Sequence, residues 1–423
     1  MGNQDEQESA PGVAASQESN PTMKRAAFRL DDKFLDELHA RIVEARAEFH
    51  ASLGQTGRPV SASESAFAEE RYSVQSIPSR EHLDELVQTS FWASLRKEER
   101  QFAQFAVGYA GNTGYPYVLA LGELKPFDIR NLVKVAPAIG NLKSAAMVYP
   151  DDKGALEIWG VANDNNAPFI VKALDPGQLI VSYAHRNIAV ISGEEAVFIK
   201  SDLHDRGAAI WSKLGFKDAP SNIAVISDLR VSVLLDTLST MRSLARGGAI
   251  IVVPENGEWR NSISSINYQG RPSYYAMRGL IKEWNELGDE RYTEAGMHRS
   301  SSIHLELRRQ ADCLAQLTSV DGATVISREL DLIGFGAKIK YDPKSDNPQI
   351  VYKLDPLEGE GAITAKEMHE LGGMRHQSAA NFVAECQEAI ALVVSEDGNV
   401  TAFVWNDEAG HVLAFARLEL TLF

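Results

Sequence analysis

The sequence predicts a mixed α/β (α+β) protein with more than one domain. At 423 residues, the chain is too long for a single typical domain. Short apolar runs separated by Asp- and Gly-rich turns follow one another over residues 115–200, a pattern typical of strands. Amphipathic helical patterns flank these runs and recur towards the C-terminus, around an apolar run at residues 247–254 that is suited to a strand buried on both faces.

The composition is that of a globular protein, with 44% hydrophobic and 24% charged residues. A net charge of −16 argues against a nucleic-acid-binding surface, which needs clustered Lys and Arg, but it still allows a local basic pocket for a nucleotide. No apolar run approaches about 18 residues, and residues 2–20 lack a signal pattern. We therefore expect a cytoplasmic protein with no membrane partner. We also expect buried thiols at Cys313 and Cys386.

The N-terminal part divides into a tail and one domain. Residues 1–24 are polar with scattered Pro, and we expect a disordered tail there. Apolar residues at helical spacing predict a helix over residues 34–53, and residues 72–111 are predicted to be mostly helical. With the β-rich unit at 115–200, these segments form a predicted helical and β-rich domain over residues 25–221.

A second domain is predicted over residues 222–423, as a mixed sheet flanked by helices. Its expected elements are a helix at 223–244, a strand at 247–254, an irregular charged stretch at 255–299, a helix capped by Ser302, strands at 324–326 and 332–339, a helix at 378–389, and a hairpin of strands at 389–395 and 400–405.

Asp321, Gly322 and Ala323 stand where that Ser302 helix passes into a strand. A carboxylate followed by glycine at such a junction leaves room for a ligand to approach the backbone. Ordinary helix termination explains the same residues, with Asp321 solvating the junction and Gly322 supplying a positive φ.

The segment Gly372 to Gln377 is a Gly-rich turn that contains Arg375 and His376 and passes into a helix. Free N–H groups at a helix start, together with an Arg, suit an anion. The alternative is a Gly-Gly turn with Arg375 in a surface ion pair. Turn chemistry likewise explains Glu396 and Asp397, although one of them could be a second carboxylate ligand beside Asp321 for magnesium or manganese.

In this order, the motifs resemble the signatures of the diadenylate cyclase (DAC) family, which includes the DNA-integrity scanning protein and condenses two ATP into cyclic di-AMP. The resemblance covers roughly residues 225–418 and is strongest at 320–339 and 372–403. It points to a divergent subgroup with an N-terminal sensor-type domain. Residues 70–220 are similar to that sensor region, and its ligand is not evident from the sequence.

The resemblance implies a role for each motif residue. Asp321 would hold the catalytic metal and help to activate the ribose 3′-hydroxyl, while Arg375 and His376 would engage the triphosphate. Asp397 would be the second metal ligand. The expected nucleotide contacts are Gly322, Ala323, Gly373, Met374, Gln377, Ser378 and Ser395.

Three positions depart from the common family pattern. Met374 stands where threonine is usual, Gln377 replaces a second arginine, and Asp397 replaces glutamate. Gln377 cannot supply charge to a leaving pyrophosphate, and Lys338 is a candidate to compensate for it.

The implied reaction is metal-assisted nucleotidyl transfer, in which two DAC domains, each with one ATP, face each other in a dimer or a larger assembly. The alternative is a DAC-like domain that has lost turnover and only binds or senses a nucleotide. A third reading is a structural protein in which both motifs are caps and turns. Metal-binding His or Cys spacings, a Gly-x-Ser-x-Gly elbow and a Walker P-loop are absent from the sequence.

Overall fold

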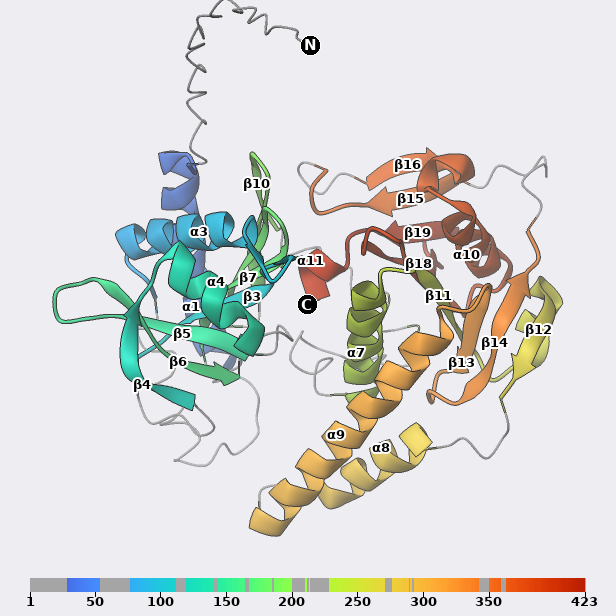
Figure 1. Cartoon of the computed structure of the whole chain (residues 1–423). Coiled ribbons are helices and arrows are strands. Elements are labelled where there is room, and N and C mark those ends of the chain that lie inside the picture. The colour runs from blue at the N-terminus through green and yellow to red at the C-terminus, as the bar shows by residue number, and fades with distance from the viewer. Residues whose placement is uncertain are drawn as a thin grey trace, which may run out of the picture.

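The computed structural model describes residues 29–53, 77–111, 119–139, 144–163, 167–184, 186–199, 210, 213, 228–270, 276–288, 290, 293–341, 350–358 and 363–422. Within them, two units are each built on one large sheet with flanking helices (Figure 1). This confirms the mixed α/β fold class. The predicted tail at 1–24 and the predicted domain start near Asn222 lie outside the described residues.

The N-terminal unit has an eight-stranded sheet in the order β10-β9-β8-β7-β3-β5-β6-β4, together with a separate two-stranded ribbon, β1-β2. Its helices are α1 (Asp32–Leu53), α3 (Arg80–Ser94) and α4 (Ile129–Ile139). Its strands are β1 (Lys97–Glu98), β2 (Gln101–Phe102), β3 (Phe105–Tyr109), β4 (Leu119–Pro126), β5 (Ser144–Pro150), β6 (Leu156–Asn163), β7 (Phe169–Asp175), β8 (Gln178–Tyr183), β9 (Arg186–Ser192) and β10 (Glu195–Phe198).

The helices of this unit cover one face of its sheet. Leu35, Leu38 and Ile42 of α1 are fully buried in the same core as Phe105 and Val107 of β3. The helix predicted over residues 34–53 is therefore confirmed, and its apolar stripe is the packing surface that stabilises it.

The prediction of mostly helical structure up to residue 111 is wrong beyond α3. Residues 105–109 form β3, an entirely buried strand between β5 and β7. The run at 105–109 has only five residues, and a run this short has no period that distinguishes a buried strand from a helix. Helix α4 also lies within the region 115–200 that was predicted as β-rich.

The C-terminal unit has a nine-stranded mixed sheet in the order β12-β14-β13-β11-β17-β18-β19-β15-β16. Its helices are α7 (Leu229–Leu244), η3 (Gly257–Ser262), α8 (Ala276–Leu287), α9 (Glu294–Leu317), η6 (Met368–Leu371), α10 (Met374–Glu385) and α11 (Glu419–Leu422). Its strands are β11 (Gly248–Val253), β12 (Ile263–Gln269), β13 (Ala323–Ser327), β14 (Leu332–Ile339), β15 (Ile350–Leu354), β16 (Ile363–Glu367), β17 (Ile390–Val394), β18 (Val400–Asn406) and β19 (His411–Phe415).

Strand β11 is buried on both faces, as its continuous apolar run predicts. Ile250 and Val252 share one core with residues of α7, α8 and α9, whereas Ala249, Ile251 and Val253 share another with α10. The sheet therefore lies between two helical layers, and every residue of β11 is buried.

Several predictions in this unit are wrong. The stretch 255–299 contains η3, β12, α8 and the start of α9 rather than irregular chain. Helix α9 is capped by Thr293, whose hydroxyl accepts a hydrogen bond from the Gly296 N–H, so Ser302 lies inside the helix and donates to the His298 carbonyl. Cys313 is exposed on α9 rather than buried, and Cys386 is half-buried at the end of α10.

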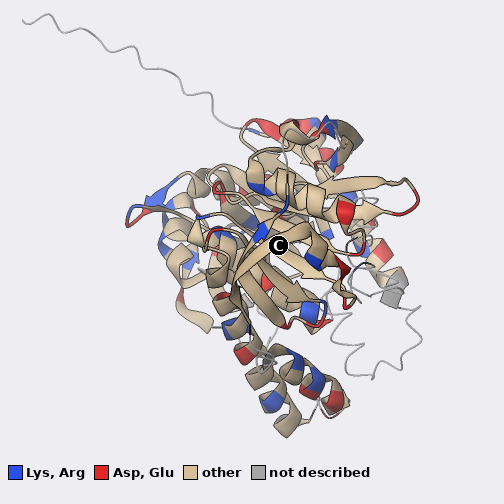
Figure 2. Cartoon of the chain, turned by 90° about the vertical axis from the view of Figure 1, so that its right-hand side faces the viewer, with Lys and Arg blue, Asp and Glu red and all other residues tan. Residues whose placement is uncertain are grey.

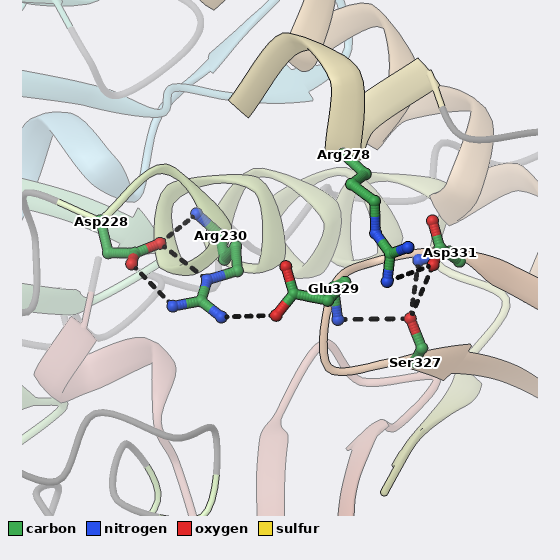
Figure 3. A network of polar contacts seen from close by, with 6 residues as sticks. All are labelled: Asp228, Arg230, Arg278, Ser327, Glu329 and Asp331. Carbon is green, nitrogen blue, oxygen red and sulfur yellow. Dashed lines mark hydrogen bonds and ion pairs between the residues drawn. The ribbon is translucent and has the colours of Figure 1, made fainter. Parts of the chain in front are cut away.

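A polar network joins α7, α8 and the turn between β13 and β14 (Figure 3). Arg230 pairs with Asp228, the N-cap residue of α7, at 3.0 Å and with Glu329 at 3.1 Å. On the other side of the same turn, Arg278 of α8 pairs with Asp331 at 3.0 Å. Burial raises the pKa of Asp331, and Arg278 opposes that effect. These pairs fix the end of β13 that lies away from Asp321.

The charged residues of both signs are spread over the surface of the C-terminal unit. Seen from the side of the C-terminal unit, the described Lys and Arg residues are interspersed with Asp and Glu rather than gathered on one face (Figure 2). Among the described helices, none has the length and apolar character needed to cross a bilayer.

Replacing Phe105 tests the central strand of the N-terminal unit. Phe105 is fully buried, whereas Phe102, three residues earlier, is 43% exposed. We expect Phe105→Ala to lower the free energy of unfolding by about 3–5 kcal/mol, because it leaves a cavity in the core. Phe102→Ala, the matched control, should cost roughly 1 kcal/mol or less. Equal losses in chemical denaturation would contradict the placement of β3.

Candidate nucleotide site

The strand directions of the C-terminal sheet bring separate motifs to one end of it. β11 runs parallel to β13 and antiparallel to β17, with Gly248 opposite Val394. The starts of β11 and β13 and the end of β17 therefore lie at the same end, which we call the site end. The segments at this end are Arg246–Gly247, Asp321–Gly322 and the turn from Ser395 to Asn399 (the 395–399 turn).

Asp321 and Gly322 form the tight connection from α9 into β13. Gly322 has a φ of +107°, and a Cβ there would lie 2.7 Å from the carbonyl carbon of Gly336 and 2.8 Å from the Ala337 oxygen in β14. Only glycine fits this close backbone approach. Ala323 is buried and pairs with Ala337, whereas Asp321 is exposed and makes no side-chain hydrogen bond or ion pair with the described residues.

The Arg-His motif lies in the first turn of α10, which begins at Met374. The prediction of a helix start at Ser378 is therefore wrong. Gly373 is the N-cap, and the Gln377 side chain donates a 2.8 Å hydrogen bond to the Gly372 carbonyl. Ser378 donates to the Arg375 carbonyl, as a serine within a helix commonly does.

Arg375 connects the start of α10 to the other segments of the site end. Its Nη1 lies 3.9 Å from Oε1 of Glu396. A Cβ at position 247 would lie 2.7 Å from that Nη1 and 3.2 Å from the Val394 carbonyl oxygen. The side chain of Arg375 thus lies against the backbone of Gly247, whose φ of +63° favours glycine and whose missing Cβ leaves room for the guanidinium.

The pair between Arg375 and Glu396 is the surface ion pair that we had considered for this arginine. Both side chains are largely exposed, so the pair contributes little to stability. A phosphate that offers two oxygens to the guanidinium could replace a single carboxylate contact at 3.9 Å.

His376 is half-buried against the sheet. Its ring meets Phe403 of β18 edge-on with centroids 6.1 Å apart, and a Cβ at position 372 would lie 3.5 Å from its Nδ1. Burial first, and then the neighbouring Arg375, lower the pKa of the imidazole. The ring is therefore neutral near pH 7 and can both donate and accept a hydrogen bond.

Gln377 is held on both sides rather than free. Its Oε1 accepts a 3.1 Å hydrogen bond from the Tyr341 hydroxyl, while its amide nitrogen binds the Gly372 carbonyl. Gln377 therefore stabilises the N-terminal end of α10 through these two hydrogen bonds. Met374, by contrast, is 57% exposed at the helix start.

The 395–399 turn closes on itself. The Ser395 hydroxyl accepts from the Asn399 N–H at 3.1 Å, and the Gly398 N–H binds the Ser395 carbonyl. This leaves the hydroxyl hydrogen of Ser395 free to donate. Asp397 is exposed and, within the described part of the chain, its carboxylate has no hydrogen-bond or ion-pair partner.

The structure joins Arg375 directly to the 395–399 turn and places Asp321 at the same end of the sheet. Asp321 precedes β13, and the 395–399 turn follows β17. These two strands flank β11, so they are about 10 Å apart. The described residues contain no group of three His, Cys, Asp or Glu that could hold a metal. The donors fit a cation shared between one or two carboxylates and phosphate oxygens, as magnesium prefers, rather than a protein-only cage.

Sequence reasoning missed two residues of the site end. Gly247 borders Arg375, and its signal was the Gly247–Gly248 doublet before the buried strand. Tyr341, which holds Gln377, gave no signal, because a lone tyrosine after a strand carries no recognisable pattern. Lys338 is exposed on β14, one residue beyond the pair Ala323–Ala337, and therefore lies at the site end.

Residues 72–163 match the model of the family described as "Probable sensor domain DACNV". The match covers α3 to β6 of the N-terminal unit and ends before β7. No curated protein matches the chain. The family model thus bears on the region predicted as a sensor and does not reach the residues of the site end.

Comparing two glycines tests the close approach at Gly322. Gly154 also has a positive φ, +86°, but a Cβ there would meet nothing within 4 Å. We expect Gly154→Ala to cost about 1–2 kcal/mol of unfolding free energy from backbone strain alone. Gly322→Ala should cost roughly 2 kcal/mol more, because the β14 backbone must move. Similar losses would show that β14 does not cross Asp321–Gly322 this closely.

The burial of His376 predicts a pH dependence of stability. Its pKa is lowered in the folded state, so unfolding takes up a proton there, and stability falls as the pH drops below the ordinary value of about 6.5. NMR titration should give a pKa for His376 below that value. His376→Gln should flatten the fall in stability between pH 7 and 5. A titration at or above 6.5 would contradict the burial against Phe403.

Proposed function

We propose that this chain is a diadenylate cyclase that condenses two ATP into cyclic di-AMP and two pyrophosphates, and that its N-terminal unit gates the reaction. One observation carries the proposal. Arg375 contacts both Gly247 and the 395–399 turn at the end of the sheet where Asp321 lies, so motifs distant in sequence form one surface. The match to a probable sensor domain named DACNV supports the same family context independently.

In the proposed reaction, the 3′-oxygen of one ATP attacks the α-phosphorus of the other. The hydroxyl loses its proton, the bond from the α-phosphorus to the bridging oxygen breaks, and pyrophosphate leaves. Repeating the step in the opposite direction closes the ring. Each C-terminal unit would supply one ATP, so two units must face each other about a two-fold axis.

The site residues would divide this work. The Arg375 guanidinium and the free N–H groups at the start of α10 would bind phosphate oxygens and stabilise the charge that develops on them. Neutral His376 and the Ser395 hydroxyl would add hydrogen bonds to the phosphates. Magnesium or manganese, held by Asp321 and Asp397 with phosphate oxygens, would supply further positive charge.

A second candidate function is nucleotide sensing without turnover. Gln377, at the position of the family's second arginine, is occupied by the Tyr341 hydroxyl and the Gly372 carbonyl. It carries no charge for a leaving pyrophosphate. A site with Arg375 as the one cation of its motif could hold ATP and turn it over slowly or not at all.

Incubation of the purified protein with ATP and manganese tests the proposal, with cyclic di-AMP measured by chromatography and mass spectrometry. We expect product from the native chain and a loss of about 10–100-fold or more in Asp321→Asn, because removing even a residue that only supports a metal ligand typically costs that much. Glu408→Gln is the matched control, since Glu408 is exposed in the turn between β18 and β19 at the opposite end of the sheet. It should keep full activity.

Thermal shift with ATP and manganese separates the remaining outcomes. Stabilisation without product would favour the sensing function, because a ligand that binds the folded state raises the melting temperature. Neither product nor stabilisation would contradict both functions.

A further inference from the structure

The two units meet at the 395–399 turn, and one arginine makes the connection. Arg242, in the last turn of α7, donates from Nε to the Gly398 carbonyl at 2.6 Å. Its Nη2 donates to Asp175 at 2.9 Å, and Asp175 ends β7 in the N-terminal unit. A single guanidinium therefore binds a turn of each unit.

This connection is partly withdrawn from water. The Arg242 side chain is 13% exposed and that of Asp175 43% exposed. The guanidinium also lies against Gly398, where a Cβ would be 3.6 Å from Nε. Breaking such a pair leaves a half-buried charge without its partner, which costs more than breaking a surface pair.

A second connection reaches the same turn through α11. Leu420 is fully buried in a cluster with Leu174, Ile180 and Val190 of the N-terminal sheet, and its carbonyl accepts from Asn187 at 3.1 Å. Figure 1 shows α11 between the two units.

Glu419, the residue before Leu420, binds the C-terminal sheet at the start of β18. The Glu419 carboxylate accepts a 2.7 Å hydrogen bond from the Val400 N–H, at the residue that follows the 395–399 turn. These two connections from the N-terminal unit therefore reach Gly398 in the 395–399 turn and Val400 directly after it.

The opposite side of the turn belongs to the candidate site. Glu396 contacts Arg375, and Asp397 is the proposed second metal ligand. Neither residue touches the N-terminal unit directly in the contacts described. A displacement of Gly398 would move both of them, because the turn is closed by its own hydrogen bonds from Ser395 to Asn399.

We propose that Arg242 is a positioning residue that couples the Asp175–Gly177 turn of the N-terminal unit to Glu396 and Asp397. Its effect on catalysis rests on the proposed cyclase function, whereas its effect on the turn does not. Pro176 and Gly177 also line a cavity of about 770 Å³ with Phe91, Trp92 and Leu95. A change of shape in that cavity reaches Arg242 through Asp175.

Hydrogen exchange of the full-length chain tests the coupling without relying on activity. In Asp175→Asn, which removes the charge and keeps the size, we expect the amides of residues 398–400 to exchange at least about fivefold faster, the lower range of typical coupling between sites. Asp152→Asn is the matched control. Asp152 lies in the turn between β5 and β6 of the same sheet and has no side-chain partner among the described residues. It should leave these amides unchanged.

A double-mutant cycle and kinetics complete the test. The amides of residues 398–400 should exchange no faster in the double variant Asp175→Asn, Arg242→Gln than in Arg242→Gln alone, because both substitutions break the same pair. If the native chain makes cyclic di-AMP, Asp175→Asn should lower kcat about fivefold or more with KM for ATP changed less than twofold. A native chain without product would contradict the cyclase function alone, and hydrogen exchange would still decide the coupling. Exchange at 398–400 equal to that of Asp152→Asn would overturn it.

Discussion

The mixed pairing of β11 is the constraint on which the C-terminal unit depends. Because this strand is apolar on both faces, it must lie inside the sheet with helices on either side. Its parallel partner β13 and antiparallel partner β17 then bring the connections before β11, before β13 and after β17 to one end. Helix α10 packs on the same strands and adds Arg375 there. The motifs thus converge because β11 is buried between a parallel partner and an antiparallel partner.

Much of this could be predicted from the sequence, because strong local patterns decide it. The glycine- and proline-bounded run at 248–253, the apolar stripe of α9 and the turn at Asp397–Gly398 are such patterns, and the structure confirms them as strand, helix and turn. Other elements depend on packing that the sequence does not display. Residues 105–109 form a strand because β5 and β7 flank them, and α10 begins at Met374, with Gly373 as its N-cap and the Gln377 side chain bound to the Gly372 carbonyl. The motif residues were found by resemblance, and the Gly247–Gly248 doublet marked Gly247, whereas Tyr341 and Arg242 could be found only from contacts in the folded chain.

The structure shows what Gln377 does at the position where the resembled DAC pattern has a second arginine. Its side chain accepts from the Tyr341 hydroxyl and donates to the Gly372 carbonyl, so it supports the start of α10. Besides Arg375, the exposed cations at the site end include Arg246, directly before Gly247, and Lys338 on β14. Two connections from the N-terminal unit end beside the acidic residues of this site, at Gly398 of the 395–399 turn and at Val400 directly after it.

The central claim is that these segments form one nucleotide site. A crystal structure of the chain with manganese and an ATP analogue whose α,β-bridging oxygen is replaced by carbon tests it most directly, with the anomalous signal locating the metal. We expect the triphosphate against Arg375 and the start of α10, with manganese within about 2.5 Å of an Asp321 oxygen. A nucleotide bound at any other place, or manganese far from Asp321, would contradict it.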